Sequence, residues 1–387
     1  MRERKYIFSF FLLLIGSISL FAQTQHDWWY TLERGKVMFR QGDYGNALMT
    51  FDDARRQRLT MYERMERDFI ALLSNYEVRR FGDSLDWVER FIYERRYADA
   101  ADALEELYYR VPKASFNNSA AAALSVLGTL KDYPEAEYWI GETYLIEGEL
   151  KLAQDQFLKA YELRSLLENP GLANDLLYKM AEICRIRQDY NEMERILLSV
   201  LHDDRLWASG LVSEASRYQQ GVPAAASVSF TRQAMARTLE NNGINRFLTL
   251  YRYGAVETIE AHRSLGFYYY NSGRHGKAQE HLMFAFLIQS TVIIDEIIRH
   301  RYDYTFTNLE ALVREINNYP LLSEYADKTL FYKTAYYLGA SLYGNGKTGP
   351  AMDIWNSLSA QNRAGEWQAR SVAQLRSPHI ERALEMP

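Results

Sequence analysis

The chain has 387 residues, of which 48% are hydrophobic and 25% charged, and it contains only eight prolines. This composition excludes an intrinsically disordered protein and permits long helices. The formal net charge of −5 argues against nucleic acid as the main ligand. Length alone allows two or three domains.

The N-terminus has the layout of a secretory signal peptide. Basic residues within the first five positions precede an apolar run over 6–21, and Ala22 is a plausible cleavage site. The run is shorter than the ~20 apolar residues of a spanning helix. Leu20 is larger than the usual residue at its place before the cleavage site, so an uncleaved anchor stays as the alternative. No cysteine follows the run, which excludes a bacterial lipoprotein anchor. We therefore expect an exported, periplasmic protein, with membrane association as the alternative.

The stretch over 137–161 has the spacing of two short helices joined by a tight turn. Ile140 and Tyr144 share one helical face with the small Gly141, where a second helix can approach closely. Gly148 follows the last apolar residue, at a place where a left-handed residue commonly ends a helix. The second helix then presents Phe157 between small alanines, so that this ring can fill a gap between side chains of the facing helix.

The same frame recurs along the chain. Four glycines precede an alanine by twelve positions, in the pairs Gly35 and Ala47, Gly141 and Ala153, Gly266 and Ala278, and Gly339 and Ala351. A turn glycine falls at one fixed offset in each, at Gly42, Gly148, Gly273 and Gly346. A large residue follows each alanine by four, at Phe51, Phe157, Leu282 and Trp355. Two weaker copies centre on Ala100 and Met193.

This frame resembles the tetratricopeptide repeat (TPR) family, whose signature is L-G-x2-Y, then A-x3-F, then Pro. The segment 265–269 matches the first part and the segment 47–51 matches the second. The family tryptophan at the fourth repeat position is absent from the four strong copies. The resemblance implies an all-α, irregular α-solenoid of TPR-like helical hairpins with inserted helices, in an exported bacterial member of the family.

The repeats and the breaks between them predict the domain organisation. Residues 1–22 are the signal peptide, 23–203 form an N-terminal TPR-like array, 204–227 form a loop or hinge, and 228–387 form a C-terminal array that ends in a capping helix. Inserted helices are expected over 60–80 and 306–318, and the capping helix over 364–384. We also expect Pro320 to break the chain before the last repeat.

No catalytic, metal or cofactor motif emerges, so we expect a protein that is not an enzyme and needs no cofactor. The seven histidines fit no common zinc arrangement. The segment 341–349 ends like a phosphate-binding loop, but it lacks the first glycine and follows a helix. The single cysteine, Cys184, falls at an inward position and is interpreted as a small core residue.

The TPR resemblance implies that the first helix of each hairpin lines a concave partner-binding surface. Carried onto this sequence, the partner-binding residues are Trp29, Lys36, Phe39, Arg40, Tyr93, Tyr138, Glu142, Tyr178, Arg185, Arg263, Phe267, Tyr270, Tyr336 and Tyr343. Tyrosine offers a large contact area and a polar handle, which suits such a groove. The competing interpretation is that single rings pack between irregular repeats.

The sequence thus favours a non-catalytic protein–protein interaction scaffold in the bacterial cell envelope. The segment 133–141 resembles repeats of envelope-assembly proteins, which implies a protein or peptide partner such as an envelope-assembly or periplasmic machine. No nucleic acid partner is expected. Membrane contact is expected only through an uncleaved signal sequence or through a partner. The alternatives are a periplasmic carrier that encloses a small apolar ligand, and an enzyme whose site is assembled across repeats.

Overall fold

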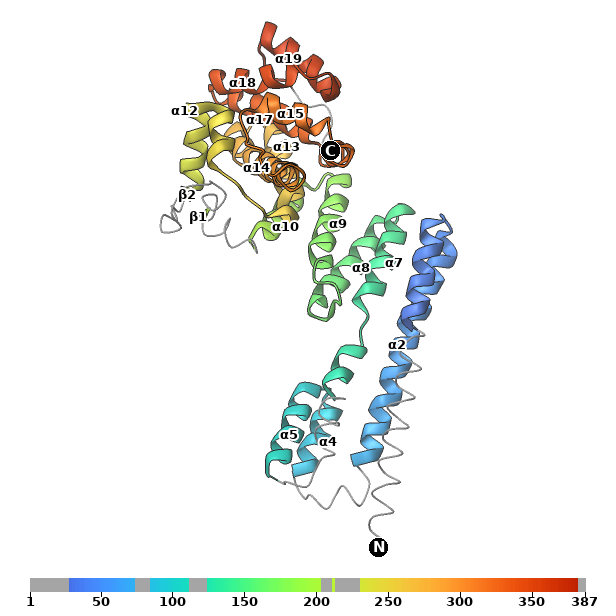
Figure 1. The fold of residues 1–387 in the computed structure, drawn as a ribbon. Helices are drawn as coiled ribbons and strands as arrows, with labels where there is room; N and C mark the ends of the chain where they lie inside the picture. Colours follow the sequence, from blue (N-terminus) through green and yellow to red (C-terminus); the bar gives the residue numbers. More distant parts are fainter. Residues whose placement is uncertain (1–27, 74–83, 111–123, 203–210, 213–229, 382–387) are drawn as a thin grey trace, which may run out of the picture. The chain divides into compact units, whose positions relative to one another are not determined.

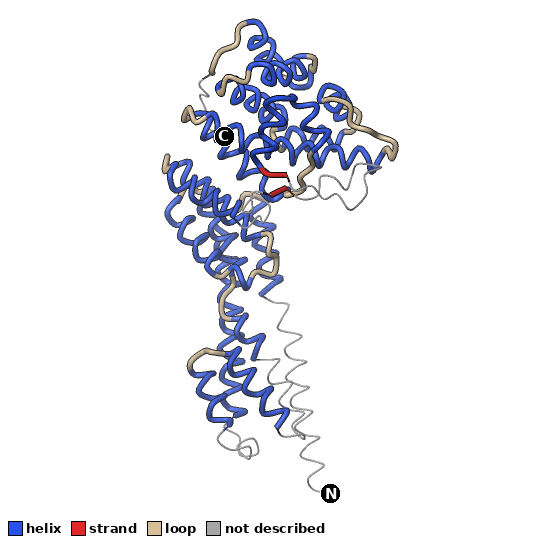
Figure 2. The backbone as a smooth tube through the Cα atoms, turned by 90° about the vertical axis from the view of Figure 1, so that its left-hand side faces the viewer, coloured by secondary structure: helices blue, strands red, loops and turns tan. Residues whose placement is uncertain are grey.

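A computed structural model describes residues 28–73, 84–110, 124–202, 211–212 and 230–381 of the chain (Figure 1). The fold is all-α, as the sequence predicts, with one antiparallel pair of two-residue strands, β1 (Leu211–Val212) and β2 (Phe230–Thr231) (Figure 2). The expected signal peptide lies outside the described residues, as does the expected hinge over 204–227 apart from β1. The chain forms two compact units, residues 1–183 and 184–387.

The first unit consists of helices and short connections. Its described elements are a helix over 28–40, α2 (Tyr44–Leu73), α4 (Ser84–Tyr93), α5 (Tyr97–Arg110), a helix over 124–130, α7 (Pro134–Ile146), α8 (Leu150–Glu162), the 3-10 turn η1 (Arg164–Leu166) and most of α9 (Leu172–Ile186).

The second unit begins within the last turn of α9. It contains α10 (Tyr190–His202), the strand pair, α12 (Arg232–Leu250), η3 (Val256–Thr258), α13 (Ile259–Asn271), α14 (His275–His300), α15 (Leu309–Ile316), α16 (Pro320–Lys328), α17 (Phe331–Gly344), α18 (Thr348–Ser359), η4 (Asn362–Ala364) and α19 (Glu366–Arg376).

Six turns between consecutive helices share one backbone geometry. Each holds a residue of positive φ, which is Gly42, Gly148, Gly273 and Gly346 in the four strong copies. In the two weaker copies, Arg95 (φ 59°) and Gln188 (φ 60°) take the same place. The next N–H always donates to the carbonyl five residues earlier, as from Glu149 to Tyr144 at 2.9 Å and from Arg96 to Phe91 at 2.8 Å. This is the hydrogen bond that closes a Schellman motif, so the hairpin frame is present in all six copies.

The first-helix glycines lie against the large residue of their own hairpin. A Cβ added to Gly141 would lie 2.7 Å from Phe157, and one added to Gly35 would lie 2.5 Å from Phe51. Gly266 meets Leu282 and Gly339 meets Trp355 in the same way. The sequence expectation of close helix approach at these glycines is therefore confirmed, because no larger residue fits there without a shift.

The first hairpin packs directly against the third. Trp28, Phe51 and Tyr133 belong to one buried cluster, and the Phe51 and Trp139 rings stack with centroids 5.9 Å apart. Glu137 on α7 is only 1% exposed. It pairs with Arg55 of α2 at 3.1 Å and with Lys159 of α8, so that two cations compensate its buried charge.

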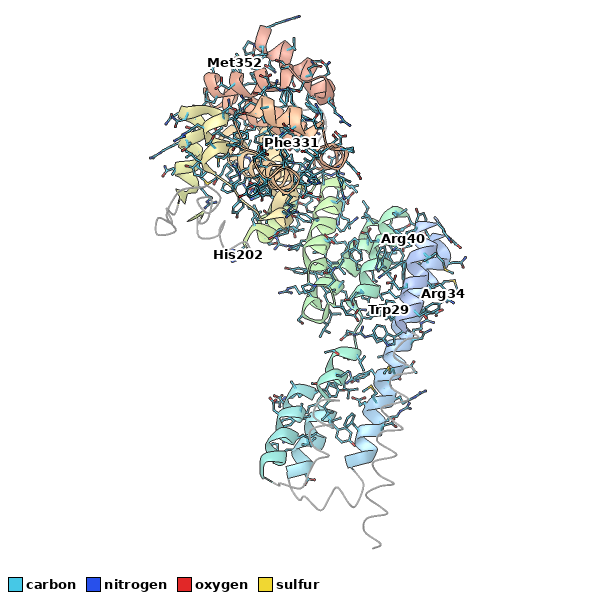
Figure 3. All side chains as sticks on the ribbon, viewed as in Figure 1. Trp29, Arg34, Arg40, His202, Phe331 and Met352 are labelled. Carbon is cyan, nitrogen blue, oxygen red and sulfur yellow. The ribbon has the colours of Figure 1, made fainter. Side chains whose placement is uncertain are left out.

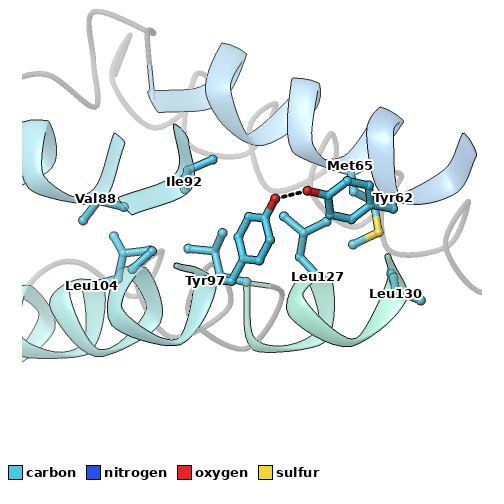
Figure 4. Close-up of a cluster of buried hydrophobic side chains, with 10 residues drawn as sticks. Tyr62, Met65, Val88, Ile92, Tyr97, Leu104, Leu127 and Leu130 are labelled. Atoms are coloured by element: carbon cyan, nitrogen blue, oxygen red, sulfur yellow. Dashed lines mark hydrogen bonds between the residues drawn. The ribbon is translucent and has the colours of Figure 1, made fainter. Parts of the chain in front are cut away.

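The second hairpin, α4 and α5, packs against the distal half of α2 in a separate cluster (Figure 4). Tyr62 and Tyr97 hydrogen-bond through their hydroxyls, and the Tyr97 hydroxyl donates to Glu66 at 2.5 Å. The order of hairpins in this unit therefore does not follow their order in the chain, because the second hairpin is set apart from the first and third.

Three expected elements differ from those in the structure. The prediction of a separate helix over 60–80 is wrong, because residues 60–73 continue α2 without a break. Pro320 does not end a helix but starts α16, where proline at the first position costs no hydrogen bond. The capping helix is shorter than expected, because α19 stops at Arg376, two residues before Pro378.

The core of the second unit is α14. Helices α12, α13, α15, α16 and α17 all contact it. Phe284, Phe286 and Leu287 are almost fully buried, and so is Phe331 of α17. The expected inserted helix over 306–318 is present as α15, with Leu309, Leu312, Val313 and Ile316 all buried.

Candidate partner-binding surfaces

Two of the expected partner-binding residues of the first unit lie exposed on the helix over 28–40. Trp29 is 46% exposed and Arg40 is exposed as well, and both are labelled in Figure 3. Trp28, the neighbour of Trp29, points inward and is 6% exposed. Trp29 and the neighbouring Tyr30, which is 65% exposed, are therefore accessible aromatic rings of this helix.

Lys36 and Phe39 lie half-buried on the same helix and contact a residue that the sequence analysis missed. The Phe39 and Trp139 ring centroids are 5.4 Å apart, and the Lys36 ammonium lies 5.6 Å from the centroid of Trp139. Trp139 is itself half-buried. Its position in the TPR frame gave no reason to include it, so only the packing of the first hairpin on the third reveals its place in this surface.

The three expected residues on α7 and on the part of α9 that belongs to the first unit differ in access. Tyr138 is 8% exposed, with its ring 5.8 Å from Phe157, and burial raises the pKa of its hydroxyl. Glu142 lies 3.1 Å from Lys179, and burial raises the pKa of the carboxyl against the opposing effect of that lysine. Tyr178 is half-buried. Tyr138 offers little area to a partner, whereas Glu142 and Tyr178 remain partly accessible.

Tyr93 lies in another cluster of the first unit, and Arg185 belongs to the second unit. Tyr93 is 64% exposed at the end of α4, in the separate cluster of the second hairpin. Arg185 is half-buried in the last turn of α9, in the second unit, and its carbonyl accepts the N–H of Gln188 at 3.0 Å.

In the second unit the expected residues are held in internal contacts. Phe267 and Tyr270 are each 3% exposed and Tyr336 is fully buried. The Tyr337 ring packs edge-on against Phe267 and Tyr270, at 5.3 and 5.0 Å. Arg263 donates to the Thr329 carbonyl at 3.0 Å and so ties α13 to the turn before α17.

The C-terminal segment covers this group of residues. The Trp367 ring of α19 packs 5.4 Å from Tyr336. Gln374, which is fully buried, donates to the Tyr336 hydroxyl at 3.2 Å. The half-buried Tyr343 donates to the Pro378 carbonyl at 3.2 Å. The sequence signal for this contact was available in Pro378, which ends α19 and releases the following residues from a helix.

A pocket of approximately 460 Å³ opens between α12, the start of α14 and the turn after α17. Its lining includes Arg232, Glu240, Gln279, Glu280 and Asn345. Gln279 donates to Glu240 at 2.8 Å and accepts from Asn345 at 2.7 Å. Lys347, the lysine of the loop that resembles a phosphate-binding motif, pairs with Glu240 at 3.1 Å. The pocket is thus lined by charged and amide groups that already satisfy one another.

A pair of histidines is buried between α13 and α14. The Nδ1 atoms of His262 and His281 are 3.2 Å apart, and the Phe284 ring stacks on His262. Burial, with Arg232 and Lys277 nearby, lowers the pKa of His281 to about 3. Burial and the neighbouring His281 lower the pKa of His262 well below its usual range. Both rings are therefore neutral at pH 7, and one Nδ1 donates to the other.

We also searched the described part of the chain for a metal site, a reactive thiol and a membrane-spanning helix. No group of three or more histidine, cysteine, aspartate or glutamate side chains is placed to hold a metal ion there. Cys184 is 3% exposed, and burial raises the pKa of its thiol, which is the behaviour of a core residue. Among the described helices, only α14 is long and apolar enough to cross a membrane, and 78% of its most apolar window is buried within the protein.

Comparison with known proteins finds similarity without a described function. No family model matches the chain. The chain is 23% identical over 350 residues to an uncharacterized protein of Treponema pallidum (strain Nichols), a match that covers 90% of each chain. It is also 23% identical over 255 residues to an uncharacterized protein of Borreliella burgdorferi, covering 63% of this chain and 78% of the relative.

Proposed function

We propose that this protein is a non-catalytic interaction scaffold of the TPR type that acts in the bacterial cell envelope. It binds a partner protein or peptide on the surface formed by the first helices of its hairpins. The observation that carries this proposal is the sixfold recurrence of one hairpin turn, with a left-handed residue at a fixed place in each. Stacked hairpins of this kind, arranged as an irregular solenoid, present long surfaces suited to protein partners.

The accessible part of that surface lies in the first unit. Trp29, Lys36, Phe39 and Arg40 follow one another along a single helix, with Trp139 beside them. Aromatic rings and arginine are the side chains most often found at the energetic centre of protein interfaces. The basic side chains add a preference for a partner with acidic groups at the rim.

The alternative of a carrier for a small apolar ligand is less well supported. The pocket of approximately 460 Å³ is lined by Arg232, Glu240, Glu280 and amide side chains. Sites for apolar ligands are lined mainly by hydrophobic and aromatic side chains. A scaffold therefore fits the described residues better than a carrier.

The proposed location in the cell envelope is inferred from the N-terminal sequence. The basic start and the apolar run over 6–21 favour export, with the mature chain in the periplasm or held at the membrane. Fractionation of cells that produce the protein tests this part directly, and its recovery in the cytoplasm at full length would overturn it.

Site-specific photo-crosslinking in native cells tests the binding surface. We expect a photoreactive amino acid at Trp29 or Arg40 to crosslink one protein partner. The matched control is Met49, which is 67% exposed in the same hairpin but lies on its second helix. Equal crosslinking from position 49, or none from positions 29 and 40, would refute the assignment of the surface.

Purified variants add a quantitative arm to this test. Trp29→Ala with Arg40→Ala should reduce capture of the crosslinked partner at least tenfold, whereas Met49→Ala should leave capture unchanged. Undiminished capture by the double variant would show that the partner binds elsewhere.

A further inference from the structure

Tyr343, one of the expected binding residues of the second unit, already contacts the chain's own segment Ser377–Glu381. We propose that this segment holds a partner-binding groove closed. The partner that displaces it is an extended acidic polypeptide segment with a carbonyl acceptor and, three residues later, a carboxylate. This inference rests on the proposed scaffold function and names the partner chemistry of one of its surfaces.

The groove side of the contact consists of hydroxyl and amide groups on rigid elements. Tyr343 of α17 donates to the Pro378 carbonyl at 3.2 Å. Gln374, fully buried in α19, donates to Glu381 at 3.4 Å, and its own oxygen accepts the His379 N–H at 2.9 Å. These groups bind one backbone N–H, one backbone carbonyl and one carboxylate, which is the pattern of polypeptide recognition.

Charge gives the contact its selectivity. Arg370 lies 3.5 Å from the Glu381 carboxylate, whose side chain is only 20% exposed. Glu381 acts on both Tyr270 and Tyr336: burial, then Tyr337 and then the charge of Glu381 raise the pKa of Tyr270, and burial and Glu381 raise the pKa of Tyr336. A partner segment without an acidic group at this place would leave Arg370 and Gln374 without that acceptor.

The segment itself has the features of a displaceable occupant. It is not helical, and its side chains at His379 and Ile380 point largely to solvent, with Ile380 52% exposed. The contacts with the groove named above are polar, in contrast to the buried rings beneath the segment. A segment tied to its site by a short connection acts at an effective concentration on the order of 1 mM. If the free peptide binds with a Kd of about 0.1 mM, the segment fills the groove about ten times out of eleven.

Point variants of the full chain test the proposal. Glu381→Gln removes the carboxylate that pairs with Arg370 and Gln374. The matched control is Glu366→Gln, which also removes a carboxylate from Arg370, at 3.3 Å, but lies outside the segment and is 61% exposed. The probe is a fluorescein-labelled peptide with the sequence of residues 376–381, followed by fluorescence anisotropy.

We expect the labelled peptide to bind the Glu381→Gln protein about tenfold more tightly than the wild type or the Glu366→Gln protein. A peptide that carries the same Glu381→Gln change should compete poorly. Hydrogen exchange gives a readout independent of any partner, since the His379 amide should lose protection in Glu381→Gln alone. Equal peptide affinity in all three proteins, or unchanged His379 protection, would overturn the proposal.

Failure of this proposal is distinguishable from failure of the scaffold function. Peptide competition without any envelope partner would support the closed groove and refute the scaffold. Crosslinks from positions 29 and 40, with no effect of Glu381→Gln on peptide binding, would support the scaffold and refute the closed groove.

Discussion

The two units use the same hairpin frame but leave different surfaces open. In the first unit, Trp29 and Arg40 stay accessible on a first helix. In the second unit, Phe267, Tyr270 and Tyr336 are buried under α19 and the residues that follow it. One pattern of residues therefore yields a surface or a core, depending on whether a further segment covers it.

The two longest helices show the same contrast. Both α2, with 30 residues, and α14, with 26, extend the second helix of a hairpin. The second half of α2 alternates apolar residues with charged ones and carries the α4–α5 hairpin on one side. Residues 282–288 of α14 are apolar on all sides, and five helices contact α14. A helix that is hydrophobic all round must be buried, and α14 meets this condition within the second unit.

Arg58→Ala should have the largest effect, confined to the first unit. The Arg58 guanidinium lies between Trp28 and Tyr133, at 4.6 and 4.5 Å from their ring centroids, and donates to the Thr129 carbonyl at 2.7 Å. Its loss leaves the Thr129 and Leu130 carbonyls without this donor and opens a gap between the two rings. We expect the free energy of unfolding of this unit to fall by about 3 kcal/mol.

Hydrogen exchange measured along a urea titration can report on the two units separately. Arg56→Ala is the control, because Arg56 is 73% exposed and pairs only at the surface with Asp52, so its loss should cost less than about 0.5 kcal/mol. Comparable losses in the two variants would contradict the buried role of Arg58.

Acidification should destabilise the second unit through its histidine pair. The pKa of His281 is about 3 in the folded protein and about 6.5 when unfolded, so only the unfolded chain gains this proton between those values. Stability from this residue is fully present above pH 6.5 and falls by about 1.4 kcal/mol per pH unit below it. Between pH 6.5 and 5, His281 alone should therefore cost about 2 kcal/mol.

The first unit should respond to acid in the opposite direction at its buried carboxyls. Burial raises the pKa of Glu135 and of Glu142, so the folded state takes up these protons first and gains stability as pH falls through that range. Urea unfolding at pH 7 and pH 5, in the wild type and in His281→Gln, measures the direction in which the stability of each unit changes. A second unit whose stability is the same at both values would contradict the neutral pair.

Alanine at a first-helix glycine should have an intermediate effect, and it can be placed in either unit. A Cβ on Gly141 meets Phe157, and one on Gly266 meets Leu282 at 2.5 Å. We expect Gly141→Ala or Gly266→Ala to cost about 1–3 kcal/mol in its own unit through overpacking. Gly45→Ala is the control, since nothing lies within 4 Å of its added Cβ within α2, and it should be neutral or stabilising by up to about 1 kcal/mol. Thermal unfolding distinguishes these outcomes.

Tyr343→Phe should have the smallest effect on stability. It removes one hydroxyl that donates to the Pro378 carbonyl, at a half-buried site, and should cost less than about 1 kcal/mol. Faster amide exchange over 377–381 with an unchanged melting temperature is the expected result. A large drop in melting temperature would mean that the segment is part of the core of the second unit.

Much of the hairpin level was predictable from the sequence because it depends on local chemistry. The left-handed backbone at the turn favours glycine, and the close approach of Phe157 or Trp355 requires a small residue beneath it. The turns at Arg95 and Gln188 were harder to recognise, because a non-glycine residue adopts the left-handed conformation there.

The arrangement of hairpins was not predictable, because an apolar face does not specify which neighbour covers it. Met61, Met65 and Phe69 share one apolar helical face in the sequence, but nothing local assigns that face to Ile92 and Leu104. The same limit applies to the expected binding residues. Tyr336 has the sequence features of a groove residue, and only the position of Gln374 and Trp367 makes it a buried one.

The continuity of α2 has a mechanical consequence. Its 30 residues extend over roughly 45 Å at 1.5 Å per residue, and no glycine or proline interrupts it after Gly45. A force applied to the α4–α5 hairpin would therefore be transmitted along α2 to its Phe51 end without bending at a hinge. Such a force on the α4–α5 hairpin would act as a torque on the first hairpin, so that α2 would serve as a lever arm.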